Sequence, residues 1–272
     1  MNSAERARLI GINLKMYFGL ARTRDWVSEI RGIADDQHET VGIPEVFVLP
    51  SFPVLESVAT LLGGGSVFWG AQDLAASPDR AQTGEVSGGM LKELGCRYVE
   101  VGHAERRRLF GETDAVVRAK IVEAFAHDLT PVLCVGEPAR SDPRSAAEFC
   151  VAQLRAARTR DDDRELVVAY EPVWAIGVDE PAPADHVRKV CAVLRDELLT
   201  RPGHSRLLYG GSAGPGTFAQ LMPSVDGLFL GRFAHDPNNV RAILREVAAT
   251  PISGSSAMDM GANASMNRKF SY

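Results

Sequence analysis

The chain repeats one pattern along its length: short apolar, β-prone segments separated by longer segments that are mostly helical in character. Eight such β-prone segments cover residues 9–14, 45–50, 66–72, 97–102, 131–136, 166–171, 206–211 and 227–231. Apolar strands that alternate with helices predict a parallel sheet whose two faces are both covered. Eight units are the number that closes a (β/α)8 TIM barrel, so we predict one α/β barrel domain.

Helical patterns separate these segments, and they are clearest at residues 23–33, 114–127, 146–158, 184–199 and 238–249. The stretch after the third strand is expected to be partly loop. An open doubly wound sheet is the alternative fold, but its usual glycine motif is replaced by GINLKMYFG after the first strand. We assign residues 1–250 to the barrel and 251–272, which lack periodicity, to a poorly ordered tail.

The composition excludes several classes of protein. The 272 residues are 45% hydrophobic and 24% charged, with a formal charge of -5 that does not suit nucleic acid. No stretch has the apolar length of a membrane span, and the N-terminus lacks a signal-peptide pattern. The cysteines form no CxxC pair, so free thiols are favoured over disulfides or metal ligands. We therefore expect a cytoplasmic protein without membrane or nucleic-acid partners.

Polar residues gather where the predicted strands end, which in such barrels is where the chemistry takes place. Glu171 ends an apolar strand and is a candidate general base. Lys15 follows the first strand and would supply positive charge. His103 precedes a helix, whose N-terminus disfavours imidazolium, so a neutral imidazole would donate to a developing oxyanion.

Glycine-rich turns follow the last strands and suit an anion. Backbone N–H groups at Gly177, Gly211, Ser212 and Gly231 are candidates to hold a phosphate. Each polar residue also has a purely structural interpretation: a strand-end glutamate paired with arginine, a histidine that caps a helix, or a simple turn. Their joint position at the ends of five strands favours a site.

Longer segments resemble one known family. TGEVSGGMLKELGCRYVEVGHAERRRLFGETD at 83–114, PVLCVGE at 131–137, VVAYEPVWAIG at 167–177 and LLYGGS at 207–212 are similar to blocks of triosephosphate isomerase. The resemblance covers roughly residues 8 to 249. It implies a homodimeric isomerase of sugar phosphates, without cofactor or metal, that acts in glycolysis and gluconeogenesis.

The resemblance also implies individual roles. Glu171 would move a proton between adjacent carbons through an enediolate, interconverting dihydroxyacetone phosphate and glyceraldehyde 3-phosphate. His103 and Lys15 would polarise the substrate oxygens with help from Asn13, and Glu105 would hold Lys15.

By the same resemblance, residues 172–182 form a lid, with Pro172 and Trp174 in its hinge and Tyr209 and Ser212 as its latch. The segment 73–87 would insert into the partner subunit beside the active site.

The sequence departs from the family pattern around the substrate. Leu14 replaces a tryptophan, Tyr17 an asparagine, Ala104 a serine, and Gly177-Val178-Asp179-Glu180 replaces GTGK. Gly231-Arg232-Phe233 stands where the last phosphate turn of the family has two glycines, and we expect Arg232 to bind anion. Together, Tyr17, Arg232 and Phe233 would reshape the pocket. The proton-transfer residues match the family, but the residues around them differ. A four-carbon ketose phosphate such as L-erythrulose 1-phosphate is therefore a second candidate substrate. An inactive barrel that only binds sugar phosphates is a third possibility.

Overall fold

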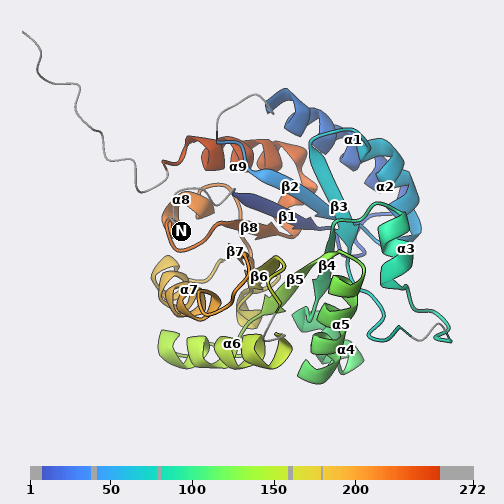
Figure 1. The fold of residues 1–272 in the computed structure, drawn as a ribbon. Coiled ribbons are helices and arrows are strands. Elements are labelled where there is room, and N and C mark those ends of the chain that lie inside the picture. The colour runs from blue at the N-terminus through green and yellow to red at the C-terminus, as the bar shows by residue number, and fades with distance from the viewer. Residues whose placement is uncertain (1–7, 38–41, 79–80, 159–161, 179, 252–272) are drawn as a thin grey trace, which may run out of the picture.

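The computed structural model describes residues 8–37, 42–78, 81–158, 162–178 and 180–251. Parallel strands form a closed barrel in the order of the chain (Figure 1). The strands are β1 Leu9–Asn13, β2 Glu45–Leu49, β3 Val67–Ala71, β4 Tyr98–Val101, β5 Thr130–Val135, β6 Leu166–Tyr170, β7 Ser205–Tyr209 and β8 Gly227–Leu230. The predicted (β/α)8 TIM barrel is confirmed, and strand bounds differ from the predicted ones by one or two residues.

Helices surround the barrel, as Figure 1 shows. They are α1 Leu20–Gln37, α2 Leu55–Leu62, α3 Gly88–Glu93, α4 Ala104–Phe110, α5 Asp114–Ala126, α6 Pro143–Ala157, α7 Ala184–Leu198, α8 Thr217–Leu221 and α9 Pro237–Ala249. The predicted start of α6 at residue 146 was three residues late. Asp142 caps this helix by accepting from the backbone N–H of Ser145, and Pro143 occupies its first turn.

Short helices account for what the sequence patterns did not show. α2, α3 and α8 were not predicted, and all of them have eight residues or fewer. Such short segments carry too few turns to display a clear apolar stripe. The helix expected directly after His103 is present as α4. After the third strand, the described residues 72–78 and 81–87 contain no helix or strand, as expected for a stretch that is partly loop. Of the predicted tail at 251–272, residues 252–272 lie outside the described residues.

Two apolar layers hold the fold together. One lies inside the barrel and includes Leu9, Phe47, Tyr98 and Phe229, and the other lies between the strands and the surrounding helices. Because side chains alternate along a strand, the inward position after Tyr98 is Glu100. Within the described residues, no helix combines the length and apolarity needed to cross a membrane.

Candidate active site

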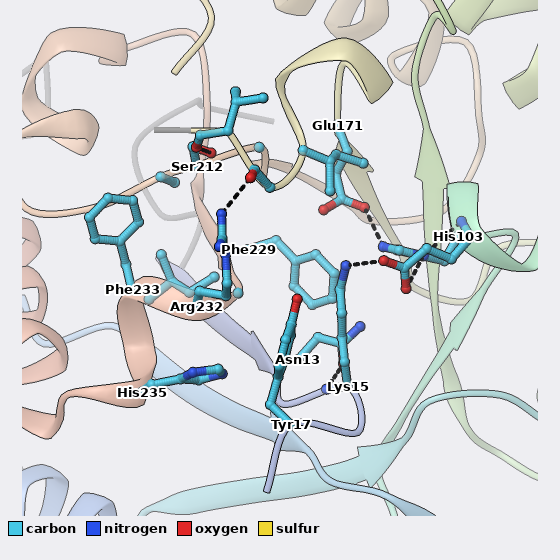
Figure 2. A pocket seen from close by; sticks show the side chains of 18 of the residues that line it. Asn13, Lys15, Tyr17, His103, Glu171, Ser212, Phe229, Arg232, Phe233 and His235 are labelled. Atoms are coloured by element: carbon cyan, nitrogen blue, oxygen red, sulfur yellow. Dashed lines mark hydrogen bonds and ion pairs between the residues drawn. The ribbon is translucent and has the colours of Figure 1, made fainter. Parts of the chain in front are cut away.

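A cavity of roughly 600 Å³ opens at the carboxyl ends of the barrel strands (Figure 2). The predicted catalytic and phosphate-binding residues all line it: Asn13, Lys15, His103, Glu105, Glu171, Gly177, Ser212, Gly231 and Arg232. Closure of the barrel thus brings together side chains that lie up to about two hundred residues apart in the sequence. The predicted lid and latch residues Pro172, Trp174 and Tyr209 are not among the lining residues.

Lys15 is held in a strained backbone conformation directly after β1. Its φ of 48° lies in the left-handed region, which is unfavourable for a side chain of this size. Its N–H donates to Asn13 Oδ1 at 2.7 Å, and its carbonyl accepts from Ser51 Oγ and Gln72 Nε2 at 2.9 and 3.0 Å. These bonds fix the backbone, so the ammonium group is aimed at the cavity.

The charge of Lys15 is maintained by its neighbours. Nζ donates to Glu105 Oε1 at 2.6 Å. Burial opposes the ammonium charge, but the bond to Glu105 and the nearby charges of Glu171 and Glu100 raise the pKa of Lys15 above its ordinary value. The same pairing outweighs burial at Glu105 and lowers the pKa of that carboxyl. Lys15 therefore stays cationic at neutral pH, as stabilising an oxyanion requires.

His103 is positioned as the N-cap of α4. Its Nδ1 accepts a hydrogen bond from the backbone N–H of Glu105 at 3.1 Å, in the manner of a capping side chain. A ring nitrogen that accepts carries no proton, so in the neutral ring the proton is on Nε2. Nε2 faces Glu171 Oε2 at 3.7 Å. With Nδ1 as acceptor, the nitrogen that His103 presents to the cavity is the donor Nε2.

Glu171 lies at the end of β6 with only 7% of its surface exposed. Its backbone N–H donates to Val135 O at 2.8 Å, which continues the ladder between β5 and β6. Opposite it is Gly210, where an added Cβ would lie 2.6 Å from Glu171 Cγ and Oε1. Glycine is therefore required there to leave room for the carboxylate. Glu171 Oε2 is buried and has no hydrogen-bond partner, so it is available to a bound molecule.

The segment after Glu171 folds over the cavity and is tied down at both ends. Trp174 Nε1 donates to Glu137 Oε1 at 2.7 Å at the start of the segment. Ser212 Oγ donates to Ala175 O at 3.1 Å, and Tyr209 OH accepts from the N–H of Ala182 at 3.3 Å. These bonds connect the segment to Tyr209 and Ser212, whose role as a latch stays a prediction.

The end of the cavity opposite His103 is suited to an anion. Ser212 and Arg232 lie there, as Figure 2 shows. Gly211 and Ser212 have φ angles of 90° and 54°, a left-handed turn of the kind that builds anion-binding concavities. The Arg232 guanidinium donates to the carbonyl of Gly177 and so contacts the lid directly. Arg22 also lines the cavity and adds positive charge at this end, because burial lowers the pKa of the His235 imidazole and the nearby charges of Arg22 and Arg232 lower it further.

Sequence reasoning missed one buried acid beside the cavity. Glu100 is 1% exposed and accepts hydrogen bonds from Asn13 Nδ2 at 2.7 Å and from Cys134 Sγ at 3.4 Å. Burial raises the pKa of Glu100 to about 7, and the nearby charge of Glu171 adds to this. The signal that could have found it is a single acid at an inward position of the apolar segment RYVEVG.

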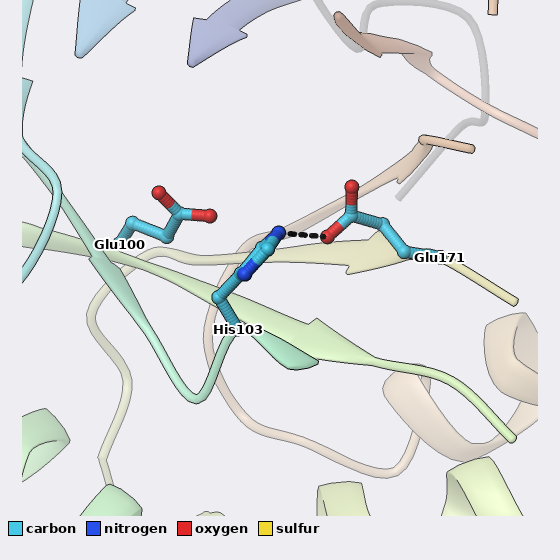
Figure 3. Close-up of side chains that lie close together, drawn as sticks. All are labelled: Glu100, His103 and Glu171. Atoms are coloured by element: carbon cyan, nitrogen blue, oxygen red, sulfur yellow. Dashed lines mark ion pairs between the residues drawn. The ribbon is translucent and has the colours of Figure 1, made fainter. Parts of the chain in front are cut away.

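Glu100, His103 and Glu171 lie close enough together to suggest a metal site (Figure 3). One polar atom from each lies within 4.8 Å of the others. A metal needs a lone pair on the imidazole nitrogen that faces it, however, and Nε2 carries the proton because Nδ1 accepts from Glu105. The arrangement suits an oxygen atom that accepts from Nε2 better than it suits a cation.

The site can carry out proton transfer beside a carbonyl group. It combines a buried carboxylate, a neutral N–H donor and a fixed ammonium group, which together can remove a carbon-bound proton and stabilise the resulting enediolate.

Comparison with known proteins gives a consistent result. The family model described as triosephosphate isomerase matches residues 8–247. An L-erythrulose-1-phosphate isomerase from Pectobacterium atrosepticum is 50% identical over 251 residues, which cover 89% of this chain and 96% of that protein. A triosephosphate isomerase from Thermus thermophilus is 38% identical over 251 residues, covering 88% and 98% of the two chains. One from Streptomyces coelicolor is 40% identical over 228 residues, covering 78% and 86%.

The protein is a sugar-phosphate isomerase built on a (β/α)8 barrel. It belongs to the triosephosphate isomerase family.

The position of Glu171 generates the first testable prediction. Replacement Glu171→Asp withdraws the carboxylate by one methylene, so we expect kcat to fall by about 100-fold or more while KM changes little. Steady-state kinetics with the best sugar-phosphate substrate measures both. The surface variant Glu148→Asp is the matched control and should behave like the parent protein. An unchanged kcat for Glu171→Asp would remove this residue from the mechanism.

Proposed function

We propose that the enzyme isomerises a four-carbon ketose phosphate, L-erythrulose 1-phosphate. The observation that carries this proposal is the 50% identity, over nearly the whole of both chains, to an L-erythrulose-1-phosphate isomerase. The triosephosphate isomerases described above share 38 to 40%. The proposal decides between the two substrates that the sequence left open.

The cavity supports a substrate different from the usual one. Tyr17, Arg232 and Phe233, which depart from the family pattern, all line it. Tyr17 and His235 are in edge contact with ring centroids 5.1 Å apart, so the loop after β1 meets the turn after β8. Lys15, His103 and Glu171 line the same cavity as these residues.

The proposed reaction uses the proton-transfer residues in the order that their geometry allows. L-Erythrulose 1-phosphate carries its carbonyl at C2 and hydroxyl groups at C3 and C4. Glu171 removes the proton from C3, and the electron pair forms a C2–C3 enediolate whose oxygens are stabilised by Lys15 and the Nε2 proton of His103. After a proton moves between the two oxygens, Glu171 returns its proton to C2. The carbonyl is then at C3, which is C2 of an erythrulose 4-phosphate numbered from the other end.

The lid has a defined purpose in this scheme. A phosphate next to an enediolate is prone to elimination in water, and a closed lid excludes water from the intermediate. The ties of the lid through Trp174, Tyr209 and Ser212 support this role. Anion recognition by Gly177, Ser212, Gly231 and Arg232 would hold the phosphate at the far end, away from His103.

A comparison of substrates tests the proposal. We expect kcat/KM for L-erythrulose 1-phosphate to exceed that for dihydroxyacetone phosphate by about 10-fold or more, the range that one added group in a fitted pocket supplies. The measurement is isomerisation of both compounds by the purified protein, with binding of 2-phosphoglycolate as the check that the site is intact. A preference for dihydroxyacetone phosphate would make this a triosephosphate isomerase. Binding of 2-phosphoglycolate without turnover of either substrate would indicate an inactive binding barrel.

Arg232 offers a second test, because its guanidinium joins the last turn to the lid carbonyl of Gly177. We expect Arg232→Gly to shift the ratio of kcat/KM values by about 10-fold toward dihydroxyacetone phosphate, since it restores the family's glycine and removes a fork of donors. Arg188→Ala, on the outer helix α7, is the control. An equal loss on both substrates would instead assign Arg232 to general phosphate binding.

We also propose that the protein works as a homodimer in the cytoplasm. Met16, which follows Lys15, is 89% exposed, and Met90 on α3 is 56% exposed. Large apolar side chains are therefore exposed to solvent next to Lys15 and just after the segment 73–87. Thr83 and Glu85 in that segment are also exposed. The cysteines Cys96, Cys134, Cys150 and Cys191 are buried free thiols, which suits a reducing compartment.

Analytical ultracentrifugation checks the oligomeric state. At micromolar concentration we expect the protein to sediment as a dimer, with a mass of about 59 kDa formed by two chains of 29.4 kDa. Exposed apolar residues beside Lys15 would then be covered by the second subunit. A monomer with full activity at the same concentration would contradict the homodimer.

A further inference from the structure

Glu100 has no function in the mechanism given above, yet it is the least expected residue near the site. It lies on the inner face of β4, at the next inward position after the core residue Tyr98. Among the described residues, its carboxylate forms no ion pair and is held only by the amide of Asn13 and the thiol of Cys134. An acid buried with such weak partners costs stability, so its presence calls for a functional explanation.

The surroundings of Glu100 define a position for one further polar atom. One oxygen of Glu100, one ring nitrogen of His103 and one oxygen of Glu171 lie within 4.8 Å of one another (Figure 3). A substrate whose reacting carbons lie beside His103 and Glu171 therefore brings its next group close to Glu100.

The chemistry of the three groups selects the kind of atom. In the proposed reaction His103 Nε2 donates to the reacting oxygens and Glu171 acts on carbon-bound protons, so Glu100 is the residue of the three that is left to bind another substrate group. A hydroxyl group can donate to a carboxylate, whereas a carbonyl or a phosphate cannot. The phosphate would be held at the opposite end of the cavity, beside Ser212 and Arg232. The position near Glu100 is thus suited to a hydroxyl at the end of the substrate that lacks the phosphate.

We propose that Glu100 determines substrate specificity by accepting a hydrogen bond from the terminal hydroxyl of a four-carbon substrate. The proposal rests on the proposed function and extends it to a named residue. Dihydroxyacetone phosphate has no carbon beyond the reacting pair on the side away from its phosphate, so it has no hydroxyl group to offer Glu100. Glu100 and Asn13, bonded to each other, would then act as one recognition unit beneath the reacting carbons.

Two variants test the proposal. Glu100→Gln keeps the shape but removes the charged acceptor, and Glu100→Leu removes the polar group. Because a hydrogen bond to a charged group is lost, we expect kcat/KM for L-erythrulose 1-phosphate to fall about 10- to 100-fold in both. The values for dihydroxyacetone phosphate and the affinity for 2-phosphoglycolate should change by less than about 3-fold, since neither compound has the fourth carbon's hydroxyl.

Stability separates this role from a structural one. A residue kept only for the fold should lower Tm when replaced, whereas removal of a weakly partnered buried carboxylate should leave Tm unchanged or raise it in Glu100→Leu. The matched control is Glu197→Gln, a buried glutamate of α7 that pairs with Arg155 and lies outside the site. That variant should lower Tm but keep the substrate ratio of the parent.

The possible failures are distinguishable. If the parent protein does not turn over L-erythrulose 1-phosphate, the proposed function fails and this assignment falls with it. If the parent turns it over but both Glu100 variants keep the ratio between the two substrates, only the role of Glu100 is overturned. An equal loss on both substrates, or a fall in Tm in Glu100→Leu, would likewise reject specificity and assign Glu100 to the scaffold.

Discussion

Pairing of β1 with β8 is the constraint on which the rest of the molecule depends. The two strands run parallel with Leu9 opposite Gly227, and this contact closes the sheet into a barrel. A Cβ at Gly227 would lie 1.7 Å from Leu9 O, so close approach of the two backbones requires glycine there. Without closure, Lys15 after β1 and Arg232 after β8 would lie at opposite edges of an open sheet. They would then not line one cavity, and the site would not form.

The site itself depends on one capping interaction. The N–H of Glu105 bonds to His103 Nδ1 while the carboxylate of Glu105 bonds to Lys15 Nζ. A single residue therefore sets the proton position on the imidazole and the orientation of the ammonium group. It also leaves Nε2 as a donor, which disfavours a metal among Glu100, His103 and Glu171 and favours an oxygen of a sugar.

The proposed proton-transfer groups and the residues that depart from the family pattern occupy different places in the barrel. The proposed proton-transfer groups stand at strand ends and at the start of a helix, where backbone bonds hold them. The altered residues Tyr17, Arg232 and Phe233 stand on loops around the cavity, and loops change at little cost to the core. Glu100 is different because it lies in the interior of the barrel itself, where an acid without an ion-pair partner is costly.

The sequence by itself determined the strand order, the barrel and the catalytic candidates, because each leaves a local sign: apolar segments that alternate with helical ones, and polar residues where strands end. It missed short helices such as α3 and α8, whose few turns carry no periodic signal. It also passed over Glu100, because only the closed barrel shows that this acid faces His103 and Glu171. Contacts between inward side chains of distant strands depend on register and closure, and these are properties of the tertiary structure alone.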